Sequence, residues 1–301
     1  MVDNTLRLIE TKHPDKQADE AYKALVGLEE HKANLLHNLR LIVQPDTLNN
    51  WKKKHHKGKL SFLDKYIPIR PLVMLSGEVG CGKTALANAI GSPLAQQLGT
   101  HLLTLETPSN IRGGGMVGEI SNRITATFAN AKAKINKAKC PGILIIDEAD
   151  DLATSRAQNQ AHHEDRAGLN VLIKQIDLLS REKVPLAVIM ITNRLDVLDP
   201  ALRRRVGLAL EFKRPNNEFI LKKLFATILE GVSYTETELK ELVKIAQAKT
   251  PHFSYSDIIQ RVGGQAILQS MARDKPLDMH VLKELLKSTA PSPLLENTKI
   301  V

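Results

Sequence analysis

A glycine-rich run carries the clearest chemistry in the sequence. It reads Gly77-Glu78-Val79-Gly80-Cys81-Gly82-Lys83-Thr84, which fits the pattern G-x-x-x-x-G-K-[ST]. In such a loop the glycines let backbone N–H groups turn toward a phosphate, and the following helix adds its dipole. Lys83 is expected to reach the outer phosphates, and the hydroxyl of Thr84 to bind Mg²⁺. The sequence therefore predicts a site for ATP and Mg²⁺, in which we read Cys81 as a small packing side chain rather than a redox group.

An acidic pair supplies a second part of this chemistry. Asp147 and Glu148 directly follow the apolar segment Ile143–Ile146, which we predict to be a buried strand. Such a pair is weak evidence by itself, but it follows the phosphate loop with one predicted strand and two predicted helices between. We expect Asp147 to lie at the metal and Glu148 to orient and deprotonate an attacking water. We interpret Asp150 and Asp151 as solvated charges at the start of a helix.

A third apolar strand ends in a polar residue. Asn193 follows the segment Leu186–Thr192. Taken alone, an asparagine in this position is usually a turn residue. Its order after the other two motifs favours a place beside the phosphate loop, where it holds the attacking water or senses the terminal phosphate.

Three adjacent arginines follow in the segment Asp199-Pro200-Ala201-Leu202-Arg203-Arg204-Arg205. On a short helix they cannot all point the same way. One or two of them, with Arg204 and Arg205 preferred, are candidates for an arginine finger that stabilises charge on a transferring phosphoryl group. The finger would act on a neighbouring subunit, which predicts an oligomer. The plain alternative is a basic surface turn.

Short apolar strands alternate with helices over the middle of the chain. This pattern predicts an α/β fold with a parallel sheet sandwiched by helices. The predicted strands are Leu72–Leu75, Leu102–Leu105, Ile143–Ile146, Leu186–Ile191 and Leu208–Phe212, and the predicted helices are Lys83–Leu98, Gly118–Ala138, Asp165–Leu179 and a short one at Asp199–Arg205. Beyond Pro215 only helix-period segments remain, which predicts a small all-helical lid domain. They are Asn216–Leu229, Thr235–Ala248, Ser254–Met271 and Asp278–Lys287.

We divide the chain into a lead-in over residues 1–70, an ATP-binding domain over 71–214, a lid over 215–290 and a loose tail over 291–301. The first part of the lead-in, up to Pro45, has a helical period. The stretch from Thr47 to Arg70 reads as irregular and contains the basic run Lys52–Lys59.

Composition limits the function classes. The 301 residues are 43% hydrophobic and carry a net charge of +9, which raises the question of a nucleic-acid partner. No apolar run approaches the ~20 residues of a membrane helix. The start of the chain has no secretory pattern, and its two cysteines form no metal or disulfide framework. We expect a cytoplasmic protein without a membrane or nucleic-acid partner.

Together these motifs resemble an AAA+ ATPase from Val26 to about Lys287. Gly27, in Val26-Gly27-Leu28-Glu29, matches the entry turn that holds adenine in that family, and His252–Asp257 resembles a conserved lid segment. Arg156 also matches the family pattern after the acidic pair. No arginine stands within Ser254–Asp257, where some members place a lid sensor, and only Arg261, a turn later, is a candidate substitute.

Three further segments resemble bacterial relatives of the thyroid-receptor-interactor, or pachytene-checkpoint, ATPases. They are Trp51–His56, Arg112–Glu119 and His162–Asn170. This resemblance implies a homohexamer that remodels a HORMA-domain protein bound to a nucleotidyltransferase in a cyclic-oligonucleotide (CBASS) antiviral system. Met116 and Val117 would form the pore loop, where most relatives carry an aromatic residue in place of Met116.

Two other functions fit part of the sequence. A DNA-associated AAA+ ATPase, such as a transposition helper or loader, would use the +9 charge and the Lys52–Lys59 run. A nucleotide-switched scaffold would bind ATP but scarcely hydrolyse it. The presence of Glu148 and Asn193 disfavours the scaffold.

Overall fold

The computed structural model describes residues 7–66, 69–108, 118–153 and 163–294. The chain divides into two compact units. Unit 1 comprises the residues up to Ala24, Glu30–Ser76 and Thr84–Glu211; unit 2 comprises Leu25–Glu29, Gly77–Lys83 and the chain from Phe212 onward.

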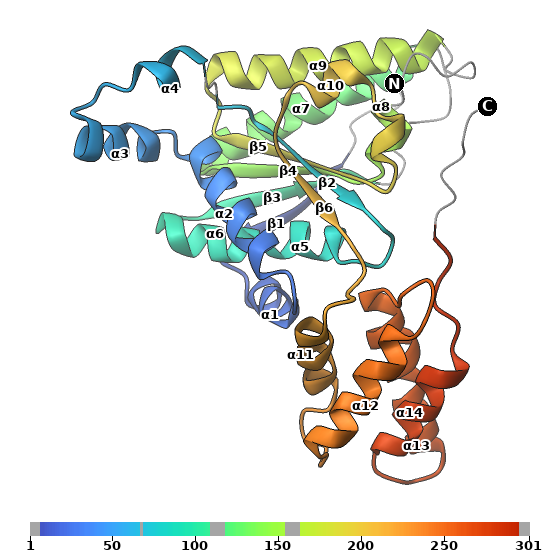
Figure 1. Cartoon of the computed structure of the whole chain (residues 1–301). Coiled ribbons are helices and arrows are strands. Elements are labelled where there is room, and N and C mark those ends of the chain that lie inside the picture. The colour runs from blue at the N-terminus through green and yellow to red at the C-terminus, as the bar shows by residue number, and fades with distance from the viewer. Residues whose placement is uncertain (1–6, 67–68, 109–117, 154–162, 295–301) are drawn as a thin grey trace. The chain divides into compact units, whose positions relative to one another are not determined.

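A mixed six-stranded sheet forms the centre of unit 1 (Figure 1). Its strand order is β1-β3-β4-β5-β2-β6, in which β3, β4, β5 and β2 run parallel and β1 pairs antiparallel with β3. The strands are β1 (Ile9–His13), β2 (Leu72–Gly77), β3 (Leu102–Glu106), β4 (Gly142–Ile146), β5 (Leu186–Thr192) and β6 (Val206–Phe212). The five strands predicted from apolar runs are confirmed within two residues at each end.

Helices cover both faces of this sheet. In Figure 1, α7 (Glu119–Ala138) and α9 (His163–Glu182) lie along one face, and α2 (Glu29–Val43), α5 (Lys83–Ala89) and α6 (Gly91–Leu98) along the other. Alternate strand residues point to the same face, and those facing α7 and α9 form one continuous core with them. The strand members of that core are Leu72, Met74, Leu103, Leu105, Leu144, Ile146, Leu186, Val188 and Met190. No helix in the described parts of the chain is both long and apolar enough to cross a bilayer.

The helical prediction for the start of the chain is wrong at β1. Strand β1 precedes α1 (Lys16–Ala24) and adds an edge to the sheet. The segment Ile9–His13 has no apolar alternation to announce a strand. Its position depends on the ladder with β3 and on buried His13, whose ring bonds the hydroxyls of Ser92 at 3.1 Å and Thr104 at 2.8 Å. These are contacts with residues far along the chain, which local periodicity cannot reveal.

The helix predicted over Lys83–Leu98 is two helices, α5 (Lys83–Ala89) and α6 (Gly91–Leu98). Pro93 explains the break, because it has no N–H to donate to the carbonyl of Ala89 and its ring crowds that carbonyl. Proline is tolerated in the first turn of α6, where N–H groups have no intrahelical acceptor.

The irregular segment predicted after Thr47 is also wrong. It folds as α3 (Asp46–His56) and α4 (Ser61–Tyr66). Helix α3 buries none of its residues, so hydrophobic spacing gives no signal for it. The charges at its two ends favour the helix instead. Asp46 in the first turn and the basic residues Lys53–His56 in the last turn interact favourably with the helix dipole.

Unit 2 contains a helical bundle with its own core. Its helices are α11 (Glu218–Ile228), α12 (Glu236–Gln247), a π-helical segment (Asp257–Gly263), α13 (Gly264–Ala272) and α14 (Met279–Ser288). Three predicted helices are confirmed, and the fourth, over Ser254–Met271, divides into the π-helical segment and α13. Polar caps define the starts, with Asn217 before α11, Thr235 before α12 and Asp278 before α14.

The loose tail expected from residue 291 is wrong for the described residues 291–294. Ser292 and Pro293 are hydrogen-bonded to Arg214, and Ser292 also bonds Asp257. Residues 295–301 lie outside the described residues.

Candidate nucleotide site

The phosphate loop, Gly77–Lys83, requires glycine for two different reasons. Gly77 and Gly80 have φ values of 124° and 74°, which side-chain-bearing residues rarely adopt. There is also no room for a side chain, since a Cβ at Gly77 would lie 2.1 Å from the carbonyl oxygen of Phe212. A Cβ at Gly80 would lie 2.8 Å from Oγ of Ser254. Gly77 and Gly80 therefore follow a backbone path at which a larger residue would be both strained and crowded.

The side chain of Lys83 lies back along this loop. Its Nζ donates hydrogen bonds to the carbonyl oxygens of Gly77 at 2.9 Å and Glu78 at 2.7 Å, and the residue is buried. The ammonium group is thus held inside the loop that the sequence motif assigns to phosphate.

Thr84 and Asp147 come together in unit 1. The Thr84 hydroxyl donates a 2.8 Å hydrogen bond to Oδ2 of Asp147. The other carboxylate oxygen of Asp147 accepts a 2.8 Å bond from the backbone N–H of Glu148. Glu148 is exposed and has a left-handed φ of 52°, a conformation that costs about 1 kcal/mol. Strand β4 thus ends in a metal-type ligand followed by an exposed carboxylate.

Asn193 lies at the end of β5, exposed, and next to Thr192, whose strand partner is Ser76. Ser76 is the residue directly before the phosphate loop. The Thr192 hydroxyl donates to Oδ1 of Asp150 at 2.8 Å and accepts from the N–H of Arg194 at 2.9 Å. Asp150 is therefore not the solvated helix charge expected from the sequence. It fixes the strand end that presents Asn193.

The three arginines have different environments. Arg205 makes a bidentate pair with Asp177 of α9, at 2.8 Å from Nε and 2.9 Å from Nη2, and also bonds the carbonyl of Ala201. Arg203 and Arg204 are exposed, at the end of α10 (Pro200–Arg203). Among the candidates, Arg205 is thus committed to its own subunit and Arg204 faces solvent.

Gly27 lies in the part of unit 2 that precedes α2. Its φ is 77°, and a Cβ there would lie 2.6 Å from Cγ2 of Ile220 and 2.8 Å from the hydroxyl of Tyr255. Burial raises the pKa of Tyr255 to about 12, so the hydroxyl stays neutral. The predicted adenine turn thus packs closely against two lid residues.

Sequence reasoning missed Arg214. Its side chain is only 5% exposed, and its Nε lies 2.6 Å from Oε2 of Glu78. A signal was present, because Glu78 places a carboxylate in a loop built for a polyanion, and such a charge needs a cation nearby. The arginine itself has no distinguishing pattern around it.

The thiol of Cys81 is buried and neutral. Burial, with the nearby charge of Glu78, raises its pKa to about 11. Cys81 and Cys140 are both free and buried. A thiol in this state is a poor nucleophile, which favours the interpretation of Cys81 as a packing side chain.

Three predicted residues, Met116, Val117 and Arg156, lie outside the described residues. Within the described ranges no cluster of three or more His, Cys, Asp or Glu side chains could hold a metal. Mg²⁺ in phosphate-transfer sites instead takes few protein ligands and keeps waters and phosphates. The pair of hard oxygens at Thr84 and Asp147 fits that demand.

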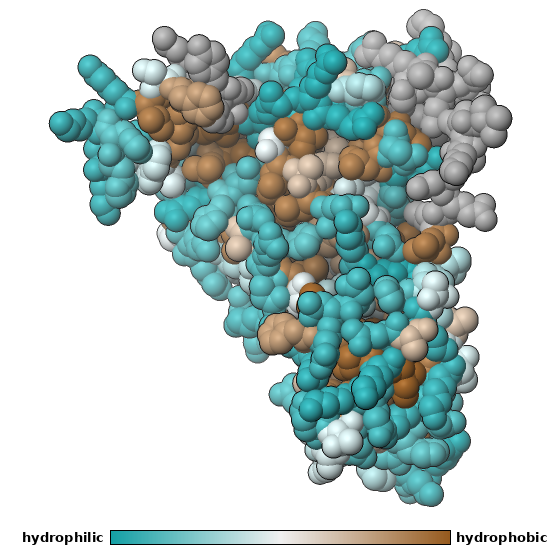
Figure 2. Space-filling view, in the orientation of Figure 1, coloured by the Kyte–Doolittle hydropathy of each residue, from teal (hydrophilic) through white to brown (hydrophobic). Residues whose placement is uncertain are grey.

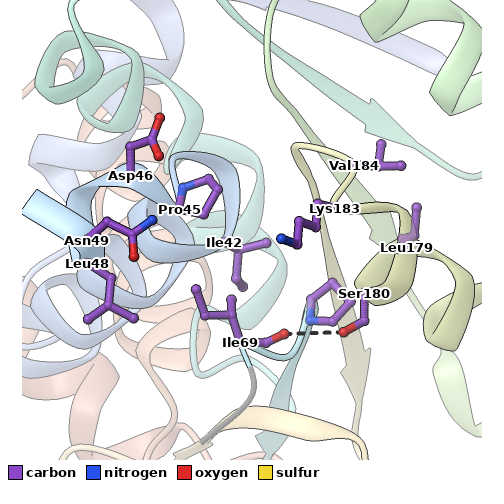
Figure 3. Close-up of a pocket in the computed structure, with 11 residues that line it drawn as sticks. Ile42, Pro45, Asp46, Leu48, Asn49, Ile69, Leu179, Ser180, Lys183 and Val184 are labelled. Atoms are coloured by element: carbon purple, nitrogen blue, oxygen red, sulfur yellow. Dashed lines mark hydrogen bonds between the residues drawn. The ribbon is translucent and has the colours of Figure 1, made fainter. Parts of the chain in front are cut away.

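A separate pocket of about 400 Å³ opens in unit 1 (Figure 3). It lies between the start of α3 and the end of α9, where the Ser180 hydroxyl bonds the carbonyl of Ile69 at 3.4 Å. Figure 2 shows hydrophobic surface beside this end of α9. Most of its lining is apolar, and it contains none of the predicted site residues. Its lining residues are Ile42, Pro45, Asp46, Leu48, Asn49, Ile69, Pro71, Leu179, Ser180, Lys183 and Val184.

Comparison with known proteins decides the family. The model of the ATPase family associated with various cellular activities (AAA) matches residues 73–214. CD-NTase-associated protein 6 of Escherichia coli (strain MS 115-1) is 38% identical over 290 residues, covering 93% of each chain. The chain belongs to the AAA ATPase family. The matched residues 73–214 include the phosphate loop and the acidic pair.

Solved structures extend the likeness of this AAA protein to the whole fold. A chain of the E. coli MS115-1 HORMA:CdnC:Trip13 complex is 36% identical, with a TM-score of 0.88 over 95% of this chain and 97% of that one. Trip13 from Rhizobiales is 30% identical, with a TM-score of 0.75 over 95% and 98%. The expected AAA+ fold with a helical C-terminal region is confirmed.

Proposed function

We propose that this AAA protein hydrolyses ATP with Mg²⁺ and uses the energy to remodel a HORMA-domain protein bound to a nucleotidyltransferase, within an antiviral signalling system. The observation that carries the proposal is the match, over 95% of the chain, to a chain of a HORMA:CdnC:Trip13 complex. The likeness to CD-NTase-associated protein 6 supports the nucleotidyltransferase as a partner.

The described residues fit the chemistry of hydrolysis. Lys83 and the N–H groups of the phosphate loop bind the phosphates, while Thr84 and Asp147 hold the metal ion. A Mg²⁺ ion held by Thr84 and Asp147 would supply positive charge to offset the charge of the phosphates. Glu148 takes the proton of the attacking water, and Asn193, fixed through Thr192 and Asp150, orients that water.

We propose a homohexamer as the working assembly. The exposed Arg204 would reach the nucleotide of the neighbouring subunit, where a planar cation stabilises the transferring phosphoryl group. Met116 and Val117 would contact the partner in the central pore. Because methionine is flexible, this grip would adapt its shape more readily than an aromatic ring.

The substitution Glu148→Gln tests hydrolysis directly. We expect it to reduce phosphate release by at least about a hundredfold, as removal of a general base does, while ATP binding measured by calorimetry stays unchanged. It should also trap the protein on its HORMA partner in the presence of ATP. The matched control is Glu230→Gln, at an exposed lid glutamate. Undiminished phosphate release by Glu148→Gln would contradict the assignment of hydrolysis, and failure to bind any HORMA-domain protein with ATP would contradict the proposed partner.

A further inference from the structure

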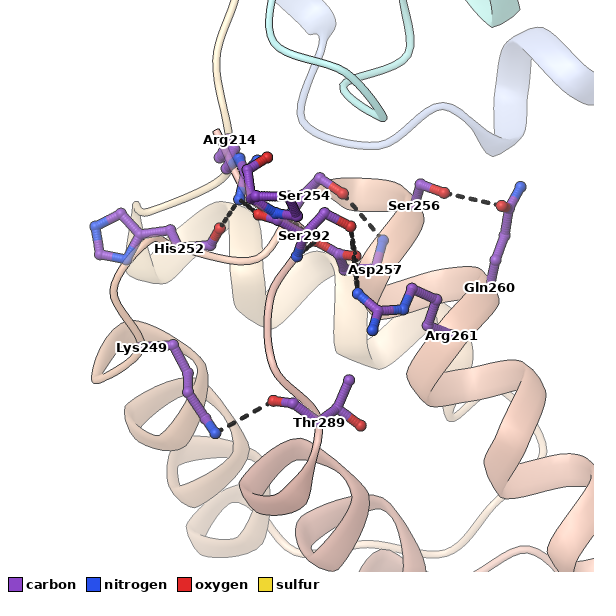
Figure 4. Close-up of polar contacts among 11 residues, drawn as sticks. Arg214, Lys249, His252, Ser254, Ser256, Asp257, Gln260, Arg261, Thr289 and Ser292 are labelled. Carbon is purple, nitrogen blue, oxygen red and sulfur yellow. Dashed lines mark hydrogen bonds and ion pairs between the residues drawn. The ribbon is translucent and has the colours of Figure 1, made fainter. Parts of the chain in front are cut away.

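Arg214 is a buried cation whose bonds all lie within unit 2. Besides the ion pair with Glu78, its Nη1 donates to the carbonyls of His252 and Ser292, both at 2.7 Å, and its Nη2 donates to the carbonyl of Pro293 at 3.1 Å (Figure 4). A buried guanidinium needs this many acceptors to offset its lost hydration. The side chain thus joins Glu78 of the phosphate loop on one side to Ser292 and Pro293 on the other.

The chain after α14 forms what we call the C-terminal strap, Thr289–Leu294. Lys249 fixes its start by donating to the carbonyls of Lys287 at 2.6 Å and Thr289 at 3.3 Å. Asp257 fixes its middle, accepting from the Ser292 hydroxyl at 2.6 Å and the Ser292 N–H at 3.2 Å (Figure 4). Burial alone would raise the pKa of Asp257, but hydrogen bonds from Ser292, Ser254 and Arg261 together hold it well below its usual range, so the carboxylate stays charged.

The lid segment that holds the strap also touches the phosphate loop. The N–H of Ser256 donates to the carbonyl of Gly80 at 3.0 Å, and Asp257 accepts a 3.0 Å bond from the N–H of Ser254. Strap, Arg214, lid segment and loop therefore form one connected polar network. A disturbance at the strap can reach the loop through Arg214 and through Asp257.

The charge at Glu78 gives this network its functional meaning. ATP is a polyanion, and an uncompensated carboxylate in the loop would repel it. Glu78 and Arg214 act on the loop interior with opposite sign, since Glu78 raises and Arg214 lowers the pKa of Cys81. Because the charges of Arg214 and Glu78 cancel, the positive charge of Lys83 is left to attract the phosphates.

We propose that Arg214 is a positioning residue for nucleotide binding, which cancels the charge of Glu78 and anchors the phosphate loop to the C-terminal strap. The strap thereby becomes a determinant of nucleotide affinity, although it lies outside the motifs that bind the nucleotide. This inference rests on the proposed function as an ATPase.

The test measures ADP affinity by calorimetry, with Mg²⁺, in the full chain. We expect Arg214→Gln to weaken binding by at least about tenfold, because it leaves Glu78 without its cation. Glu78→Gln in the same chain should restore the affinity to within about threefold of wild type, since the repulsive charge is then gone. Arg273→Gln, at an exposed lid arginine, is the matched control and should bind like wild type.

A pair of truncations tests the strap. Removal of residues 291–301 takes away two acceptors of Arg214 and should weaken ADP binding by about threefold or more, whereas removal of 295–301 retains them and should not. This pair keeps the test valid if thermal unfolding shows that Arg214→Gln has lost its fold.

Four results are decisive. Wild-type affinity in Arg214→Gln, a double variant as weak as Arg214→Gln, or equal affinity in the two truncations would each overturn the inference. A wild-type chain that binds neither ADP nor ATP would instead refute the proposed function, so the two failures are distinguishable.

Discussion

The Thr84 hydroxyl and the Asp147 carboxylate are hydrogen-bonded at 2.8 Å, although 63 positions separate them in the chain. The parallel pairing of β2 with β5 and of β5 with β4 places the carboxyl ends of β2 and β4 at one edge of the sheet. Asp147 directly follows β4, and Thr84 lies at the start of α5. This contact gives the first prediction. Thr84→Ala should raise the Mg²⁺ concentration needed for half-maximal phosphate release and lower the rate by about 10- to 100-fold, as loss of metal-site oxygens does. Thr84→Ser keeps the hydroxyl and serves as control, and identical Mg²⁺ curves for wild type and Thr84→Ala would refute the metal role.

The finger assignment predicts different results for neighbouring arginines. Arg204→Ala should lower phosphate release by about a thousandfold with an unchanged unfolding temperature, because an arginine finger acts only on the transition state. Unlike Arg204→Ala, Arg205→Ala should lower the unfolding temperature, because it leaves Asp177 without its bidentate partner. In mixtures, Arg204→Ala subunits should regain activity with Lys83→Ala subunits. No recovery at any mixing ratio would exclude a finger acting between subunits.

Gly27 offers a comparison with a matched control. Gly27→Ala and Gly231→Ala both place a side chain at positive φ, costing about 1 kcal/mol each. Only at Gly27 does the new Cβ meet Ile220 and the hydroxyl of Tyr255, whereas nothing lies within 4 Å of a Cβ at Gly231. Gly27→Ala should therefore be the less stable variant by roughly 1–3 kcal/mol in denaturant unfolding, and should bind ATP more weakly. Equal stability of the two variants would show that the turn relaxes freely.

Buried His13, on edge strand β1, should make the stability of the fold sensitive to acid. Burial lowers its pKa, and Asp15 opposes this only in part. When the pH falls below about 6.5, the ordinary pKa of histidine, His13 is protonated in the unfolded chain but stays largely neutral in the folded chain. The free energy of unfolding should thus fall as pH decreases, by at most about 1.4 kcal/mol per pH unit from this group. Unfolding temperatures between pH 7.5 and 5.5 should fall more steeply for wild type than for His13→Asn. Exposed His280 supplies the control, because His280→Gln should follow wild type; parallel curves for wild type and His13→Asn would contradict the prediction.

The two buried thiols, Cys81 and Cys140, should react slowly with thiol reagents. Burial raises the pKa of Cys81 to about 11 and also raises the pKa of Cys140. Native protein at pH 8 should therefore react with a disulfide reagent at least about tenfold more slowly than unfolded protein, and Cys81→Ser should bind ATP like wild type. Rapid labelling of Cys81 in the native chain would reopen a redox role.

Much of the fold could be predicted because its signals are local. Five strands coincide with apolar runs in the sequence, and three lid helices have clear 3.6-residue periods. The exceptions lack such signals. Strand β1 is polar and depends on β3, α3 has no buried face, and Pro93 interrupts a helix whose apolar spacing continues across the break.

The sequence by itself determined the kind of chemistry, because glycines, Lys83, Thr84 and the pair Asp147-Glu148 must stand at particular spacings to bind and hydrolyse a nucleotide. Only the tertiary structure decided which partner each charged side chain has. It paired Arg205 with Asp177, Asp150 with Thr192, and Arg214 with Glu78 and the C-terminal strap. Such pairs join residues far apart in the chain, and a charged side chain carries no local mark of its partner. Their choice depends on how the sheet and the lid bring distant segments together, and on the cost of leaving a charge buried alone.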